Sequence, residues 1–334
     1  HVDSSAASDV YKRQGVDSFT NRIDLTDNLP TRLAVVDIGS NAIRLLGVES
    51  SLFDQDELLR KRYQIRLGQD VFAKGVISEE LMEEFVDAFS DIQRQMELHK
   101  IDCYWAVATS ALREAANADE ACKRVFDRTG LKIEVINGRQ EALLIHEAMR
   151  AKFKFSSSHY LMGDLGGGSF DFVHRSSSKE RAFSLELGAV RMMKLGVEIF
   201  PKIAEAFESE RSFFMQFLKS LKNGPNAQLI LTGGNARALL RLQKRILGKT
   251  NCQDRLLRES LEQLVKTLDQ MSDQEKVDQV GLRSDRADVV VPAAIIYLEL
   301  MNHLNFERAF VPSVSLKHGI IREALRGGGH SICR

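Results

Sequence analysis

Two stretches of this chain combine an acid with glycines and small polar residues in a pattern suited to binding phosphate. The first is Asp37-Ile38-Gly39-Ser40-Asn41, and the second is Asp164-Leu165-Gly166-Gly167-Gly168-Ser169. Glycines let successive backbone N–H groups converge on an anion, and a carboxylate at a strand end can hold a hydrated cation beside it. A tight hairpin usually needs only one or two glycines, so the second stretch favours a phosphate site over a simple turn.

Each stretch lies between two strands, and the pattern around it occurs twice. We expect strands at 33–38, 42–48 and about 60–67 around the first stretch, and at 161–165, 170–174 and 181–187 around the second. Helices and further strands then alternate in both halves, with strands at 104–108, 131–136 and 229–231. Helices are expected to begin after Ser78, at Asn117 with Glu120 completing a capping box, and at Gly138.

This repetition predicts an internal duplication of one mixed three-layer α/β unit. The two acid-glycine-serine loops would then face each other across a cleft between the halves, which is the usual place for a ligand.

The composition restricts the partners. The chain has 334 residues with 46 basic and 46 acidic side chains. This balance argues against broad attraction to nucleic acid or membrane, so any polyanion must be held by a local cluster of Arg and Lys. The four cysteines form no CxxC pair, which favours reduced thiols in a cytoplasmic protein. No apolar run is long enough to cross a bilayer.

The start of the chain is expected to lie outside the fold. Residues 1–14 look foreign, because Asp9-Val10-Tyr11-Lys12-Arg13-Gln14 resembles the translation of a transposase end sequence used in preparing sequencing libraries. We therefore treat 1–30 as a foreign or disordered leader.

Seven segments, in order along about 33–325, resemble the exopolyphosphatase and guanosine pentaphosphate phosphohydrolase family. They are 37–41, 109–113, 138–145, 164–169, 188–191, 286–288 and 319–325. An ordered set of this kind is far more specific than one glycine loop. The resemblance implies the duplicated ribonuclease H-like fold of actin, hexokinase and the heat-shock ATPases.

The resemblance also implies a division of the chain into domains. Domain I would span 31–137 and include a returning helix at 315–327, domain II would span 138–314, and 328–334 would be a tail. Longer family members add helical domains at the C-terminus, and this chain is expected to be the short two-domain form.

Matching the family motifs position by position assigns the site. Glu141 resembles the base that activates water, Asp164 a metal-linked acid near that water, and Arg113 the arginine that contacts the phosphate chain. The phosphate cradle would be Gly39, Ser40, Asn41, Gly166, Gly167, Gly168 and Ser169. The implied cofactor is Mg²⁺, with Mn²⁺ as the alternative, held by Asp37, Asp164 and Asp171.

The chain departs from the family pattern at three places. Gln140 precedes Glu141 where members often have a second acid, and Asp171 stands where Glu is usual. Gly233-Gly234-Asn235 replaces a more usual Ser-Gly-Thr type of turn. The shorter Asp171 side chain puts the metal geometry in question.

Some of these residues also have structural interpretations. At a helix N-terminus Glu141 would stabilise the macrodipole, and only the resemblance favours catalysis. Whether Arg44 reaches phosphate is left open. Arg286 and Asp288 are interpreted as a structural pair.

The sequence therefore predicts a cytoplasmic hydrolase that releases the terminal phosphate of short polyphosphate, of guanosine pentaphosphate (pppGpp), or of both. No nucleic-acid or membrane partner is expected, and a homodimer is left open. An ATP-dependent small-molecule kinase of the same fold and a non-catalytic alarmone sensor are the alternatives, the sensor because of Asp171.

Overall fold

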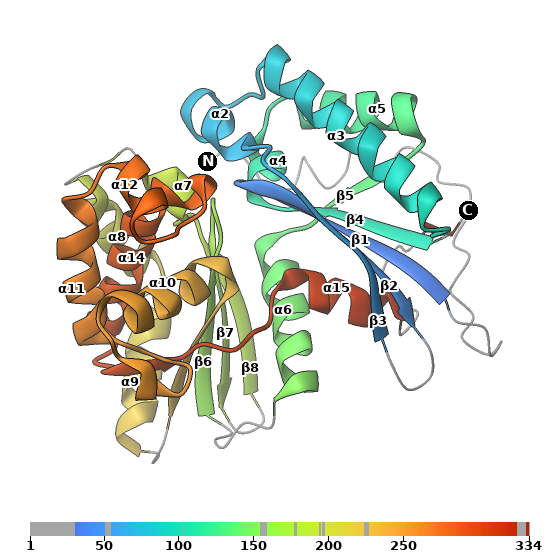
Figure 1. The fold of residues 1–334 in the computed structure, drawn as a ribbon. Helices are drawn as coiled ribbons and strands as arrows, with labels where there is room; N and C mark the ends of the chain where they lie inside the picture. Colours follow the sequence, from blue (N-terminus) through green and yellow to red (C-terminus); the bar gives the residue numbers. More distant parts are fainter. Residues whose placement is uncertain are drawn as a thin grey trace.

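The computed structural model describes residues 31–50, 55–101, 103–153, 159–176, 179–193, 195, 198–223, 227–325 and 332–333. The predicted leader 1–30 and most of the predicted tail lie outside these residues. Within them, two six-stranded sheets stand side by side, each covered by helices (Figure 1).

The first sheet begins with an antiparallel meander and continues with parallel strands. The meander consists of β1 (Thr31–Gly39), β2 (Ala42–Ser50) and β3 (Gln55–Tyr63). β4 (Cys103–Ala108) pairs parallel to β1, and β5 (Ile133–Val135) pairs parallel to β4. All six residues of β4 are buried, as expected of a strand covered on both faces.

The second sheet repeats this order. Its meander is β6 (His159–Leu165), β7 (Phe170–Ser176) and β8 (Lys179–Leu185). β9 (Gln228–Thr232) pairs parallel to β6, and β11 (Arg308–Phe310) pairs parallel to β9. The predicted duplicated α/β fold is therefore confirmed. The second sheet also gains an antiparallel edge strand, β10 (Arg255–Leu257), which the sequence did not indicate.

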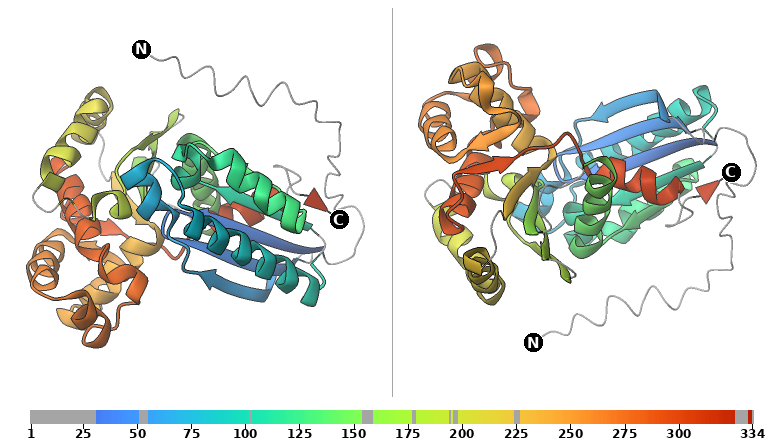
Figure 2. Two further views of the ribbon diagram at one scale, coloured as in Figure 1. Left: turned by 90° about the horizontal axis from the view of Figure 1, so that it is seen from above. Right: turned by 90° about the horizontal axis from the view of Figure 1, so that it is seen from below.

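Helices form three layers around the sheets (Figures 1 and 2). One face of the first sheet packs against α2 (Leu67–Lys74), α3 (Glu79–Leu98), α4 (Ser110–Glu114) and α5 (Ala118–Thr129). The second sheet packs against α7 (Ala189–Met192), α8 (Ile199–Ser209), α9 (Arg211–Asn223), α10 (Gly233–Ile246), α11 (Arg258–Asp269) and α14 (Val290–His303). Outside this core lie the 3₁₀ turn Thr250–Cys252, α12 (Asp273–Asp278) and α13 (Ser284–Ala287).

Two helices fill the space between the sheets. They are α6 (Gly138–Lys152) and α15 (Leu316–Leu325), which pack on each other and share a core with residues of both sheets. Alternation along β1 explains this double covering: Ala34 and Val36 face the α3 layer, whereas Leu33 and Val35 face α6 and α15.

The structure corrects two local predictions. The third strand ends at Tyr63, and α2 begins at Leu67, because the segment after the strand turns away to cover the first loop. Asn117 forms no capping box with Glu120, since its side-chain amide pairs with the backbone of Ile77 at 2.9 Å in both directions.

The thiols differ from the expectation of reduced cysteines. Cys103 on β4 is disulfide-bonded, whereas Cys122 and Cys252 are free. The short strand β12 (Ile332–Cys333) pairs antiparallel with β4, and Cys333 stands opposite Cys103 in that register. No described helix is both long and apolar enough to span a bilayer.

The contact between α15 and α6 depends on Gly319. A Cβ atom at this position would lie 2.1 Å from the carbonyl oxygen of Leu144, which is backbone and cannot move aside freely. We expect Gly319→Ala to lower the free energy of unfolding by roughly 1–2 kcal/mol, because overpacking exceeds the gain of about 1 kcal/mol in helix propensity. Urea denaturation measures the change. Glu323→Ala on the same helix is the control, and equal stability of the two variants would contradict the close contact.

Candidate active site

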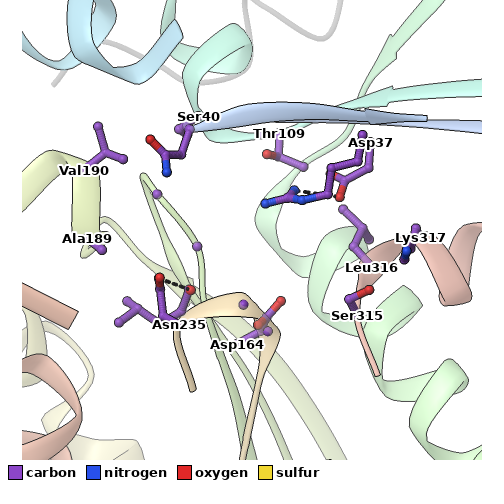
Figure 3. Close-up of a pocket in the computed structure, with 18 of the residues that line it drawn as sticks. Asp37, Ser40, Thr109, Asp164, Ala189, Val190, Asn235, Ser315, Leu316 and Lys317 are labelled. Atoms are coloured by element: carbon purple, nitrogen blue, oxygen red, sulfur yellow. Dashed lines mark hydrogen bonds and ion pairs between the residues drawn. The ribbon is translucent and has the colours of Figure 1, made fainter. Parts of the chain in front are cut away.

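A cavity of about 280 Å³ lies between the two halves. Both predicted loops line it, together with the first turns of α6, α10 and α15. Figure 3 shows Asp37 and Ser40 on one side and Asp164 and Asn235 on the other, with Lys317 at the end nearest α15. The duplication therefore brings the two acid-glycine-serine loops to one cavity, as the sequence predicted.

The two loops meet through a glycine. A Cβ on Gly167 would lie 2.9 Å from the Cβ of Ser40 and 3.1 Å from Cγ2 of Val190. Only glycine lets the backbone of the second loop approach the first so closely. Ser40 and Ser110 share a hydrogen bond of 2.8 Å between their hydroxyl oxygens, which fixes the first loop against α4.

The predicted cradle residues lie on this cavity with one exception. Gly39, Ser40, Asn41, Gly166, Gly167 and Ser169 all line it. Gly168 does not, because it packs against Ser110 and Phe72, and a Cβ there would lie 2.3 Å from the Phe72 ring.

Asp164 stands where β6 ends beside the start of α10. A Cβ on Gly233 would lie 2.0 Å from its Oδ1 atom, and Gly233 has φ +88°, so this position requires glycine on both counts. Oδ1 is buried and has no hydrogen-bond partner among the described residues. Burial raises the pKa of this carboxyl group above its ordinary value. Gly233 therefore makes room for Asp164.

Glu141 occupies the first turn of α6, on the wall of the cavity. Asn137 and Gln140 close this helix end as a reciprocal capping box, with two hydrogen bonds of 2.9 Å. Gln140, one of the three departures, is thus a capping residue, and Glu141 is left free for the cavity. Glu141 is 8% exposed, and its Oε2 atom has no partner among the described residues. Burial, and then the neighbouring carboxylate of Asp171, raise its pKa well above the ordinary value.

Asp171 is buried behind the cavity wall. Its two oxygens accept hydrogen bonds from Ser184 at 2.5 Å and from Ser169 at 2.9 Å. It does not line the cavity, and burial raises its pKa to about 7. The structure therefore makes Asp171 a neighbour of Glu141 and not a wall residue.

Arg113 also lies off the wall. Its Nη1 atom donates to the carbonyl oxygen of Ile136 at 2.7 Å, just before α6 begins, and it is absent from the cavity lining. Its charge opposes the rise in the pKa of Glu141 that burial and Asp171 cause. This geometry supports positioning of the α6 start more directly than contact with phosphate.

Asp37 and Arg44 form a cross-strand ion pair of 2.9 Å on β1 and β2, and both line the cavity. Arg44 therefore reaches the site, a question that the sequence left open.

Most of the positive charge at the site comes from residues that the sequence analysis did not select. The lining contains Arg44, Arg60, Lys61, Arg62, Arg237, Arg283, Arg286 and Lys317, against the acids Asp37, Glu141 and Asp164. Burial, and then Arg44, lower the pKa of Arg62 to about 10 and that of Arg286 to about 9. The run Arg60-Lys61-Arg62 was the sequence signal for this cluster, and crowded cations of this kind favour a polyanionic ligand.

The predicted pair of Arg286 and Asp288 is wrong. Arg286 donates to Oδ1 of Asn235 at 2.7 Å, and Asp288 pairs with Arg66 at 2.8 Å. Gly234 allows the first contact, because a Cβ there would lie 2.1 Å from the Arg286 guanidinium.

Few carboxylate oxygens at the site are free to hold a divalent cation. Among the described residues no group of three or more His, Cys, Asp or Glu side chains has the arrangement of a metal site. Magnesium, however, is often held by one or two carboxylates together with the phosphates of the substrate. The unpartnered Oδ1 atom of Asp164, which lines the cavity, fits that case. Asp37 is paired with Arg44, and Asp171 accepts hydrogen bonds from two serines, so both of these carboxylates already have protein partners.

The fold and the cavity define a duplicated α/β protein with a cationic, acid-containing phosphate cleft. The sequence model of the Ppx/GppA phosphatase family matches residues 50–327, and the chain belongs to this family of exopolyphosphatase-type hydrolases. Exopolyphosphatase 1 of Mycobacterium leprae is 25% identical over 303 residues, covering 88% of this chain and 89% of that protein. Exopolyphosphatase 2 of Mycobacterium tuberculosis is 25% identical over 308 residues, covering 87% and 96%.

The solved structures agree with the fold. The crystal structure of an exopolyphosphatase from Cytophaga hutchinsonii has a TM-score of 0.77 at 23% identity, covering 90% of this chain and 99% of that one. The Ppx/GppA family member from Aquifex aeolicus has a TM-score of 0.66 at 24% identity, covering 90% and 99%.

The raised pKa of Asp171 has a consequence for stability in the metal-free protein. The folded state binds this proton up to about pH 7, whereas an unfolded Asp titrates near pH 3.9. The stability that this group contributes is therefore complete below about pH 4 and is lost as the pH rises through 7. We expect Asp171→Asn to gain stability relative to the wild type between about pH 5 and pH 8, by roughly 1 kcal/mol or more.

Thermal unfolding with EDTA at several pH values measures this difference. The control is Asp127→Asn, an exposed partner of Lys123 on α5. A constant difference between wild type and Asp171→Asn across that range would show that Asp171 is ionised in the folded protein.

Proposed function

We propose that this cavity hydrolyses the terminal phosphoanhydride bond of polyphosphate, of pppGpp, or of both. The observation that carries the proposal is Glu141, a buried carboxylate with a free oxygen on the wall of a cavity formed by two phosphate-type loops and eight cationic side chains. Water, a base and donors aimed at charged oxygens are the parts that such a hydrolysis needs.

The two loops bind the terminal phosphoryl group. The available donors on the wall are backbone N–H groups near Gly167 and the hydroxyl group of Ser40, which can accept from Ser110 and still donate to phosphate. A hydrogen bond to a charged oxygen contributes roughly 1.5–3 kcal/mol, so two facing loops hold one phosphate without a high net charge on the whole protein. The arginine and lysine side chains around them neutralise the following phosphates.

Glu141 then accepts the proton of the attacking water through its free oxygen. A base must be ionised to act, and burial beside Asp171 opposes ionisation. The substrate phosphates bind to the cationic side chains and not to Glu141. The positive charge of Arg113 favours the ionised form of Glu141. The raised pKa brings the base closer to the working pH, where general-base catalysis is most efficient.

Mg²⁺, or alternatively Mn²⁺, is the proposed cofactor. Asp164, whose Oδ1 atom has no partner among the described residues, would hold it together with phosphate oxygens of the substrate. When bound, the ion supplies positive charge that polarises the terminal phosphoryl group.

The substrate assignment rests on two supports. Relatives that match most of the chain are named exopolyphosphatases, and the family name includes a guanosine pentaphosphate branch. Both substrates present a terminal phosphoanhydride to the same loops. We further propose that the protein acts in the cytoplasm, without nucleic-acid or membrane partners, either alone or as a homodimer.

Replacing the base tests this mechanism. We expect Glu141→Gln to lower kcat by roughly 10²–10⁴ without loss of folding, because the amide cannot accept the proton. Phosphate release with Mg²⁺ is measured on tripolyphosphate, longer polyphosphate, pppGpp and ATP. Glu147→Gln, on the same helix but outside the cavity, is the matched control.

The other outcomes separate the alternatives. Wild-type turnover in Glu141→Gln would remove the base assignment. ADP formation that requires a hydroxylated acceptor would indicate the kinase, and pppGpp binding without phosphate release would indicate the sensor.

A further inference from the structure

A second cavity, of about 410 Å³, adjoins the first. It is lined by α10 and by the segment that connects α12 to α13, and it shares Arg283 and Arg286 with the first cavity. The two spaces therefore have a common wall made of two arginines, and nothing in the hydrolytic step uses the second one.

Helix α10 connects the two cavities. Its first turn, from Gly233 to Arg237, lines the first cavity, and its later turns line the second. At 1.5 Å per residue, Gly234 and Arg245 lie roughly 16 Å apart along the helix. A ligand that follows this helix would thus span a much greater length than one phosphoryl group.

The helix carries a stripe of arginines along this path. Arg237, Arg241 and Arg245 are spaced four residues apart, which places them on roughly one face, and Arg237 lines the first cavity whereas the other two line the second. Like charges four residues apart destabilise a helix by a few tenths of a kcal/mol per pair. The stripe therefore weakens the isolated helix and would be relieved by an anion lying along it.

The charges in the second cavity are only partly neutralised by the protein. Its lining contains five Lys and Arg side chains and no acid. Lys244 pairs with Asp254 at 3.3 Å and Arg283 with Asp285 at 3.1 Å, but no hydrogen bond or ion pair of the Arg241 or Arg245 side chain occurs within the described part of the chain. Both of these arginines are exposed.

Backbone geometry gives Arg245 its place. Gly281 adopts φ +66°, and a Cβ there would lie 2.2 Å from Nη1 of Arg245. This backbone conformation favours glycine. The guanidinium group of Arg245 therefore lies against the loop between α12 and α13 at a position without a side chain.

We propose that the second cavity binds the distal phosphates of a linear polyphosphate chain whose terminal phosphate lies in the first cavity. This inference rests on the proposed function and names its substrate class. The cations continue along a line from Arg286 and Arg283 to Arg241 and Arg245, as an extended chain of phosphates requires. The lining has no aromatic side chain on which a nucleoside base could stack, so a linear phosphate chain fits better than a nucleotide.

The test compares chain lengths in an Arg241→Gln/Arg245→Gln double variant. Both side chains are exposed and unpaired, so the fold should be unaffected. We expect KM for a polyphosphate of several tens of phosphates to rise roughly tenfold, while kcat and the KM for tripolyphosphate stay unchanged. Lys266→Gln/Arg308→Gln removes two exposed charges that line neither cavity and is the matched control.

Binding is measured separately, by titration calorimetry in a Glu141→Gln background with Mg²⁺, so that failure of hydrolysis does not hide the result. A tenfold loss of affinity for the long chain alone supports the subsite even when the wild type hydrolyses nothing. Equal affinity of both proteins for the long chain overturns it, even when hydrolysis is confirmed. A loss confined to pppGpp also overturns it, because the cavity would then hold the nucleoside part.

Discussion

The structure depends on the crowding of like charges at the junction of its two halves. Glu141 and Asp171 are buried acids and Asp164 is a half-buried one, and burial raises the pKa of each. Arg286 is a buried base and Arg62 a half-buried one, and burial lowers the pKa of both. The charged form of each group would be more stable in water. A ligand that carries negative phosphates and a divalent cation provides the missing counter-charge for both sets, so the site is arranged for its bound state.

Glycine is what lets these charges come together. Gly167 brings the second loop onto Ser40, and Gly233 and Gly234 leave room for Asp164 and Arg286. A side chain at any of these three positions would occupy the space of a catalytic or binding group. The replacement of the usual turn by Gly233-Gly234-Asn235 is therefore consistent with a working site, because Asn235 also donates to Leu165 at 3.0 Å and ties α10 to β6.

The sequence was sufficient for the fold and for the loops, because both depend on local patterns that recur twice. Asp37 to Asn41 and Asp164 to Ser169 could be recognised as equivalent, and the duplication required them to face each other. The cations were harder to predict, since Arg237, Arg283 and Lys317 come from three separate elements and meet only in the folded chain. Arg113 and Asp171 were placed by motif alone, and motif order does not show that Ile136 and the two serines occupy their polar atoms.

With two cavities, hydrolysis of the terminal phosphate and binding of the rest of the phosphate chain take place at different positions. The first cavity must place one phosphoryl group beside Glu141, and the two glycine loops line it for this purpose. Binding the rest of a long anion needs positive charge but few precisely placed contacts. Exposed arginines on a helix supply this charge at little cost in desolvation. That charge lies on α10, whose first turn carries Asn235 and contacts Asp164 on β6, so affinity is connected to position: a chain held along the helix is directed toward the acids at its start.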